Sequence, residues 1–179
     1  YTVLVTDINT CTNTAVTNII VNPAPIANAT GNNPCLNDNI NLTATGGVTY
    51  SWSGPGGYSS NLQNPTISPS TFNNSGNYIV TVTDVNGCIA TANINVTVNP
   101  IPVPSITSGP NTGCAPLCVQ FTVNSTPSPS TAVWTLGNGS GATGLNAETC
   151  YNTAGVYTIT AGMTDQNGCS GFATYTVEV

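Results

Sequence analysis

The chain has 179 residues, enough for one large domain or two small ones, and 39% of them are hydrophobic, which suits a packed core. Only 3% are charged, against about 25% in ordinary globular domains; Lys, Arg and His are absent and the net charge is −6. With no cation to neutralise phosphate, the composition argues against binding to nucleic acids or to anionic membrane surfaces. The sequence has no run of 18 apolar residues, so membrane insertion is not expected.

The first predicted element is a hairpin at the start of the chain. The run Tyr1–Thr6 alternates in the manner of a strand, and a turn at Asp7 leads into a second strand that ends in Val21-Asn22-Pro23. Because Tyr1 already lies in a strand-like run, we expect residues 1–22 to be the C-terminal hairpin of a truncated domain.

This hairpin recurs twice, at Tyr78–Cys88 and Tyr157–Cys169. In each copy, Thr-Asp is followed four positions after the Asp by Cys, so that Cys11, Cys88 and Cys169 mark one place in the repeat. Two strands around an Asp-x-Asn turn predict a β-hairpin. A period of about 80 residues with many short strands predicts a tandem array of β-sandwiches.

The period divides the chain into a second domain, residues 23–100, and a third, residues 101–179. The junctions are Asn22–Pro25 and Asn99–Pro104, and both are rich in proline. Short proline-rich linkers are extended and stiff. The predicted fold class is therefore all-β, with the domains in a rod-like array.

The third domain contains Trp134-Thr-Leu-Gly-Asn-Gly139 and, later, Ala154-Gly-Val-Tyr157. This order resembles a PKD domain, whose usual centre is Trp-x-Phe-Gly-Asp-Gly, although Leu136 and Asn138 replace the Phe and the Asp. The second domain, with Ser51-Trp-Ser-Gly-Pro-Gly-Gly57, resembles the immunoglobulin-like (Ig-like) repeats that accompany PKD domains in giant Bacteroidota surface proteins. The resemblance implies tandem Ig-like, PKD-type β-sandwiches outside the cell, in an adhesin, a gliding filament or a spacer.

Four aromatic residues are predicted to be structural. Trp52 and Trp134 occupy the place of the tryptophan that packs across an Ig-like sandwich, and Tyr78 and Tyr157 resemble a tyrosine corner. The alternative for the two tryptophans is stacking on a sugar.

The seven cysteines of a secreted chain are expected to form disulfides. In an Ig-like strand order, Cys118 begins strand B and Cys150 ends strand E, which is its antiparallel neighbour. Val119, Phe121 and Tyr151 point inward, so both cysteines face outward at the same end. Cys118–Cys150 is therefore a predicted disulfide.

The remaining cysteines allow two schemes. One places a bridge in each repeat, Cys35–Cys88 and Cys114–Cys169. However, the first cysteine of each pair lies where the chain leaves the domain and the second where it enters, about 20 Å away along a six-residue strand, while a disulfide needs Cα atoms within about 7 Å. Head-to-tail stacking instead predicts an interdomain Cys35–Cys169 bridge, with Cys11, Cys88 and Cys114 bonded to domains outside this chain.

The repeated aspartates Asp84 and Asp165, together with Asp7, are candidate calcium ligands, with a turn-capping role as the alternative. No other cofactor or metal is expected. Catalysis lacks a base, because His, Lys and Arg are absent and the six acids are scattered. The chain is therefore not expected to be an enzyme.

The sequence predicts a structural repeat module, a stalk or spacer of a secreted bacterial surface fibre or adhesin, whose partners are neighbouring repeats of the same protein. Two alternatives stay open: an accessory module that binds surface glycans, and a subunit of a polymerised extracellular filament. A spacer should bury both tryptophans, whereas a glycan-binding module should expose at least one of them.

Overall fold

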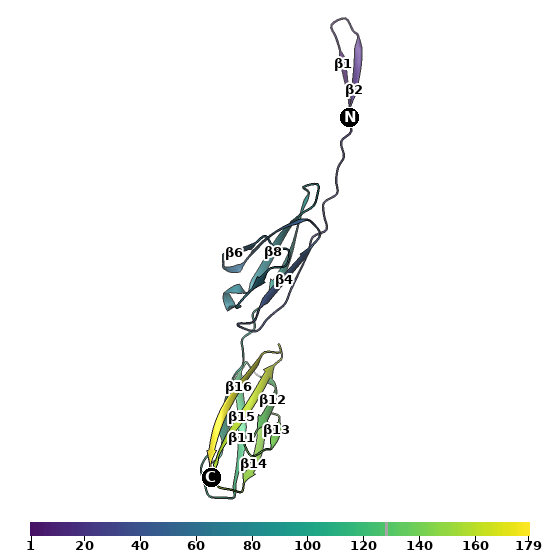
Figure 1. Ribbon diagram of the computed structural model, residues 1–179. Coiled ribbons are helices and arrows are strands. Elements are labelled where there is room, and N and C mark those ends of the chain that lie inside the picture. Colours follow the sequence, from purple (N-terminus) through teal and green to yellow (C-terminus); the bar gives the residue numbers. More distant parts are fainter. Residues whose placement is uncertain (128) are drawn as a thin grey trace.

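A computed structural model describes residues 1–127 and 129–179 of the chain. From the N-terminus it contains a two-stranded hairpin and two β-sandwiches, which follow one another end to end (Figure 1). The hairpin consists of β1 (Thr2–Thr6) and β2 (Thr12–Val16). A segment without strands then leads to the first sandwich.

The central sandwich packs a three-stranded sheet against a four-stranded sheet. The first sheet has the order β3 (Asn28–Gly31), β4 (Ile40–Thr45), β7 (Thr66–Ile67). The second has the order β6 (Tyr58–Ser60), β5 (Thr49–Gly54), β8 (Gly76–Thr83), β9 (Ile89–Val96). Two short 3₁₀ turns, η1 (Pro55–Gly57) and η2 (Phe72–Asn74), complete it.

The C-terminal sandwich repeats this plan. Its three-stranded sheet has the order β10 (Val103–Ser108), β11 (Leu117–Thr126), β14 (Asn146–Tyr151). Its four-stranded sheet has the order β13 (Gly141–Thr143), β12 (Pro129–Thr135), β15 (Val156–Asp165), β16 (Ser170–Glu178). All the named strand pairs are antiparallel, as in tandem Ig-like β-sandwiches.

Alternation along the strands builds one core in each sandwich. In β4 every second side chain is buried, and the same period holds through β8 and through β11 to Val123. The central core gathers around Trp52 and Tyr78, and the C-terminal core around Trp134, Phe121 and Tyr151. Because the two cores share no residue, each sandwich has its own source of hydrophobic stability.

The N-terminal hairpin shows what alternation cannot do alone. Its side chains Val3 and Val5 correspond to Val80 and Val82 in the repeat, which are fully buried, yet they are 57% and 60% exposed. The difference arises because β8 packs against an opposite sheet, whereas among the described residues β1 pairs only with β2. Among the residues described here, no helix is long and apolar enough to cross a membrane.

Candidate functional site

The junction between the sandwiches is the candidate functional site, and its first half is built around Cys35. Cys35 forms an isolated parallel β-bridge with Asn99, the residue at which the chain leaves the central sandwich. The Leu36 N–H donates to the Asn99 carbonyl at 2.8 Å, and the Asn99 N–H donates to the Pro34 carbonyl at 2.8 Å. Ser70, which is fully buried, donates its hydroxyl to the Cys35 carbonyl at 3.0 Å. Cys35 is thereby fixed at the end where the chain leaves the central sandwich.

The second half of the junction is the turn between β15 and β16. One carboxylate oxygen of Asp165, Oδ1, accepts hydrogen bonds from the backbone N–H groups of Asn167 (2.8 Å) and Cys169 (2.9 Å). Gly168 has a φ of 83°, a conformation that glycine adopts without strain. Cys169 is fully buried and Asp165 is 3% exposed. The Asp-x-x-x-Cys hairpin therefore presents its cysteine from a turn that the carboxylate holds rigid.

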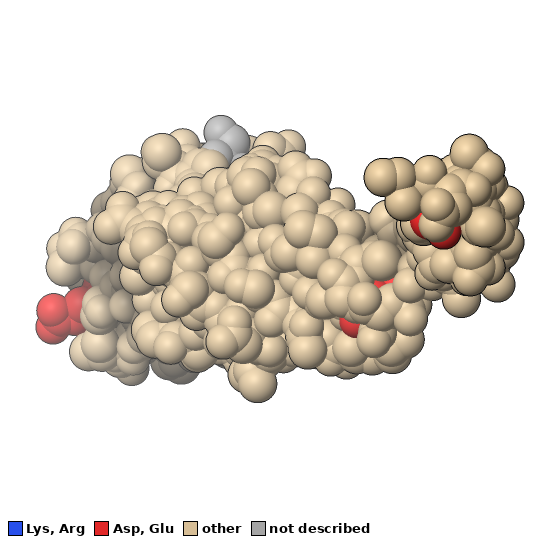
Figure 2. All heavy atoms as spheres, turned by 90° about the horizontal axis from the view of Figure 1, so that it is seen from above, with Lys and Arg blue, Asp and Glu red and all other residues tan. Residues whose placement is uncertain are grey.

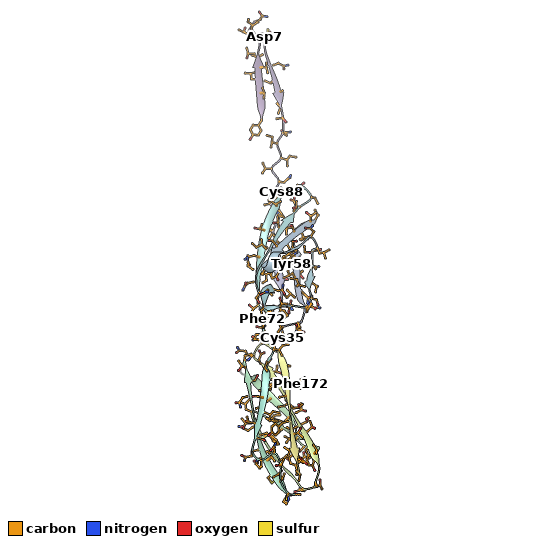
Figure 3. The ribbon with its side chains drawn as sticks, turned by 90° about the vertical axis from the view of Figure 1, so that its left-hand side faces the viewer. Asp7, Cys35, Tyr58, Phe72, Cys88 and Phe172 are labelled. Atoms are coloured by element: carbon orange, nitrogen blue, oxygen red, sulfur yellow. A yellow bond between two sulfur atoms is a disulfide. The ribbon has the colours of Figure 1, made fainter. Side chains whose placement is uncertain are left out.

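Cys35 and Cys169 form a disulfide whose Cα atoms are 5.6 Å apart, although 134 residues separate them in the sequence. This is the interdomain scheme of the two that the sequence allowed. Cys88 and Cys114 remain thiols, so neither bridge of the one-per-repeat scheme is present. In Figure 3, Cys35 lies at the junction and Cys88 lies at the far end of the same sandwich, which separates the two cysteines of one repeat by the length of its strands.

The linker packs against the hairpin that carries Cys169. Pro102 is buried, and a Cβ atom at Gly171 would overlap the Pro102 carbonyl group. Glycine at this position therefore permits close approach of the linker backbone to β16. The two sandwiches are joined at this junction by a packed linker and by a covalent bridge.

A second disulfide, Cys118–Cys150, lies within the C-terminal sandwich. The two cysteines are directly opposite in the register of β11 and β14, and both are exposed. Their neighbours Val119 and Tyr151 are buried on the opposite face. This bond therefore links two strands that are already paired, on the outer face of their sheet.

The two tryptophans lie in the cores, each 1% exposed. The indole N–H of Trp134 donates to the Gly144 carbonyl at 2.8 Å. Tyr78 and Tyr157 each donate a hydroxyl to the carbonyl four positions earlier, on Asn74 (2.8 Å) and Thr153 (2.9 Å), as in a tyrosine corner. Burial, and secondarily the nearby Tyr58, raises the pKa of Tyr78 above its ordinary value.

The hairpin aspartates use their carboxylates to close turns. Asp84 accepts from the backbone N–H groups of Asn86 (2.9 Å) and Cys88 (2.8 Å), and Asp7 makes the equivalent pair of bonds. Within the described residues, no group of three or more His, Cys, Asp or Glu side chains is placed to hold a metal ion. The carboxylate in each of the three hairpins therefore accepts backbone hydrogen bonds from its own turn.

The charged groups of the surface are few and all acidic. Acidic side chains appear as separate spots among uncharged atoms on the face seen in Figure 2, and the sequence has no Lys, Arg or His. Of the residues lining the two hollows beside β14, only Glu148 is charged. The Glu148 carboxylate accepts a hydrogen bond from the Gln120 side-chain amide at 3.4 Å.

Sequence reasoning missed several residues that build the junction. Ser70, Asn99 and Gly171 act through backbone contacts between segments that are distant in the chain. The repeat of Val-Asn-Pro at positions 21–23 and 98–100 was the available signal for Asn99, because it marks the same place in two domains.

Residues 99–179 match the PKD domain family. The match covers the C-terminal sandwich and its linker, and the chain as a whole has the fold of tandem Ig-like β-sandwiches. A comparison with curated protein sequences finds no match. Among solved structures, the PKD1 domain of Vibrio anguillarum Epp is 23% identical over 44% of this chain and 93% of that one, with a TM-score of 0.38. The PKD1 domain of the Vibrio cholerae metalloprotease PrtV is 27% identical over 44% and 96%, with a TM-score of 0.37.

Another solved structure resembles a longer part of the chain. The three N-terminal domains of the highly immunogenic outer capsid protein (Hoc) of bacteriophage RB49 are 18% identical over 87% of this chain and 58% of that one, with a TM-score of 0.44.

Proposed function

We propose that this chain is a stalk or spacer module of a secreted bacterial cell-surface fibre or adhesin, and that its covalent junction limits how far it extends under tension. The observation that carries the proposal is the Cys35–Cys169 disulfide between the two sandwiches. A disulfide of this kind is stable in an oxidising, extracellular setting. The absence of Lys and Arg adds resistance to proteases that cleave after basic residues.

The disulfide changes the path by which force travels through the molecule. Tension applied at Tyr1 and Val179 passes along the chain to Cys35, crosses the bond and leaves from Cys169. Residues 36–168 form a closed loop beside this path. Strands β4 to β9 of the central sandwich and β10 to β15 of the C-terminal sandwich lie in that loop, so tension cannot pull them out in series.

The size of the effect follows from chain lengths. The covalent path contains only the segments 1–35 and 169–179, which the bond joins. At about 3.5 Å per extended residue this path is about 160 Å long, whereas the whole chain would be about 630 Å long. A stalk with this junction therefore keeps its reach when it is pulled.

Burial of both tryptophans supports a spacer over a glycan-binding module. Sugar stacking requires an exposed aromatic face, and both indole rings are in the cores. The indole N–H of Trp134 donates to the Gly144 carbonyl, whereas that of Trp52 is buried without a hydrogen-bond partner among the described residues.

Single-molecule force spectroscopy between the chain ends tests the proposal. The oxidised chain should reach about 160 Å. The double variant Cys35→Ser/Cys169→Ser should reach about 520 Å, because only the loop between Cys118 and Cys150 stays closed. The matched control Cys118→Ser/Cys150→Ser should still stop at about 160 Å, since its cysteines lie inside the closed loop. An oxidised wild-type chain that extends as far as the first variant would overturn the proposal.

A further inference from the structure

The remaining thiols occupy the same positions in the repeat as the two cysteines of the junction. Cys88 follows Asp84 as Cys169 follows Asp165, with the same pair of backbone hydrogen bonds to the carboxylate. Cys11 follows Asp7 in the same way. Three hairpins therefore present a cysteine from one geometry, and in one of them that cysteine is bonded to a neighbouring sandwich.

Cys114 corresponds to Cys35 in register as well as in sequence order. Cys35 bridges in parallel to Asn99, which lies eleven positions after the hairpin cysteine Cys88. In the C-terminal sandwich the equivalent parallel bridge joins Thr112 to Glu178, which lies nine positions after Cys169. Cys114 lies two positions after Thr112, so its level in the sandwich corresponds to eleven positions after Cys169, as for Cys35 and Asn99. The Gly113 N–H donates to the Glu178 carbonyl at 3.2 Å and fixes this segment. Cys114 is exposed at the end where the chain leaves the C-terminal sandwich.

The surroundings of Cys88 give an independent sign of a partner. Its Sγ lies 4.0 Å from the carbonyl oxygen of Asn22, the residue that corresponds to Asn99 in the repeat. In the junction between the sandwiches, Asn99 lies beside Cys35, and Cys35 is bonded to Cys169. In a junction of the same design, a cysteine equivalent to Cys35 would lie beside Asn22. Cys88 therefore lies next to the place that its bonding partner would occupy.

We infer that Cys88 and Cys114 are the two ends of a covalent strut, each bonded to a further Ig-like repeat of the same type. The partner of Cys114 is a cysteine in an Asp-x-x-x-Cys hairpin of a following repeat. The partner of Cys88 is a cysteine at the exit end of a preceding repeat. Each bond forms by oxidation of two thiols to a disulfide, with two electrons and two protons passing to an extracellular thiol oxidant such as a protein disulfide.

The strut would make an array of such repeats nearly inextensible. The segment from Cys88 to Cys114 includes β9, the linker and β10. It runs from the far end of the central sandwich, along both sandwiches, to the end where the chain leaves the C-terminal sandwich (Figures 1 and 3). Fully stretched it measures about 90 Å. Because most of it is already in strands or in extended linker, tension can lengthen it only slightly.

The inference rests on the proposed function, because it extends the Cys35–Cys169 junction to further repeats. The test uses the full chain with a second copy of residues 99–179 appended after Val179. This protein is oxidised, its remaining thiols are blocked, and it is cleaved before aspartate without reduction. The expected product links peptide 84–164 to the final peptide, which starts at Asp165 of the appended copy. In the variant Cys114→Ser this product should be lost.

The outcomes separate the two proposals. One outcome is that peptide 7–37 is linked to the peptide that contains Cys169 of the original copy, while the cysteine of the final peptide carries the thiol-blocking group. This outcome overturns the strut and leaves the stalk proposal standing. The strut also fails if the final peptide is linked to the appended copy's own Cys114. If peptide 7–37 is not linked to the peptide that contains the original Cys169, the stalk proposal fails.

Discussion

The central and C-terminal sandwiches are built on one plan and are tied differently. Both pair a three-stranded with a four-stranded sheet, bury one tryptophan and carry an Asp-x-x-x-Cys hairpin. The C-terminal sandwich has the Cys118–Cys150 bond between paired strands, whereas the central sandwich, in the part of the chain described, has only the Cys35 bond that leaves it. The comparison shows that a disulfide can serve either the stability of one domain or the connection between two.

The largest expected effect tests whether the two cores are independent. Trp52→Ala and Trp134→Ala should each lower the free energy of unfolding of their own sandwich by about 3–5 kcal/mol, because each leaves a large cavity. The remaining tryptophan reports on the other sandwich by fluorescence during urea unfolding. Its midpoint should stay unchanged; a parallel shift of both sandwiches would show that they share one cooperative unit.

The next effect concerns the bond within the sheet. Cys118→Ser/Cys150→Ser should lower the stability of the C-terminal sandwich by about 2–4 kcal/mol, since the closed loop restricts its unfolded state. Urea unfolding followed through Trp134 measures the change. Equal destabilisation of the central sandwich, followed through Trp52 in a Trp134→Phe background, would contradict the division of labour between the two bonds.

A smaller effect is expected where the linker meets β16. Gly171→Ala should cost about 1–3 kcal/mol and slow formation of the Cys35–Cys169 bond, because the added methyl group overlaps the Pro102 carbonyl. The matched control is Gly162→Ala on β15, where the nearest atom to a new Cβ is 3.9 Å away. Thiol quantification during oxidative refolding measures both; indistinguishable rates would show that linker packing does not guide the bond.

The smallest effect comes from Tyr78. Tyr78→Phe should lower the stability of the central sandwich by about 1 kcal/mol through loss of the bond to Asn74. The pKa of Tyr78 is raised in the folded state, so its contribution is full below about pH 10 and is lost as the pH rises through the folded value. Urea midpoints at pH 8 and pH 11, with thiols blocked, should fall less in Tyr78→Phe than in wild type. An identical fall would contradict this role.

Much of the fold could be predicted from the sequence because its signals are local and repeated. The Tyr-to-Cys hairpin recurs three times, and alternation in runs such as 78–83 marks the buried face. The interdomain bond could be argued because the strands keep Cys35 and Cys88 apart. The contacts of Ser70 and Gly171 could not, since each joins residues that are far apart in the sequence: Ser70 bonds to the Cys35 carbonyl and Gly171 lies against the Pro102 carbonyl. For Asn99, the repeated Val-Asn-Pro marked the position but not its hydrogen bonds to residues 34 and 36.

The central claim is that a disulfide joins neighbouring sandwiches, and its most direct test is peptide mapping of the oxidised chain. Cleavage before aspartate without reduction places Cys35 in peptide 7–37, Cys169 in peptide 165–179 and Cys88 in peptide 84–164. The account predicts that peptides 7–37 and 165–179 are linked to each other. A product that links 7–37 to 84–164 through Cys88 would contradict it.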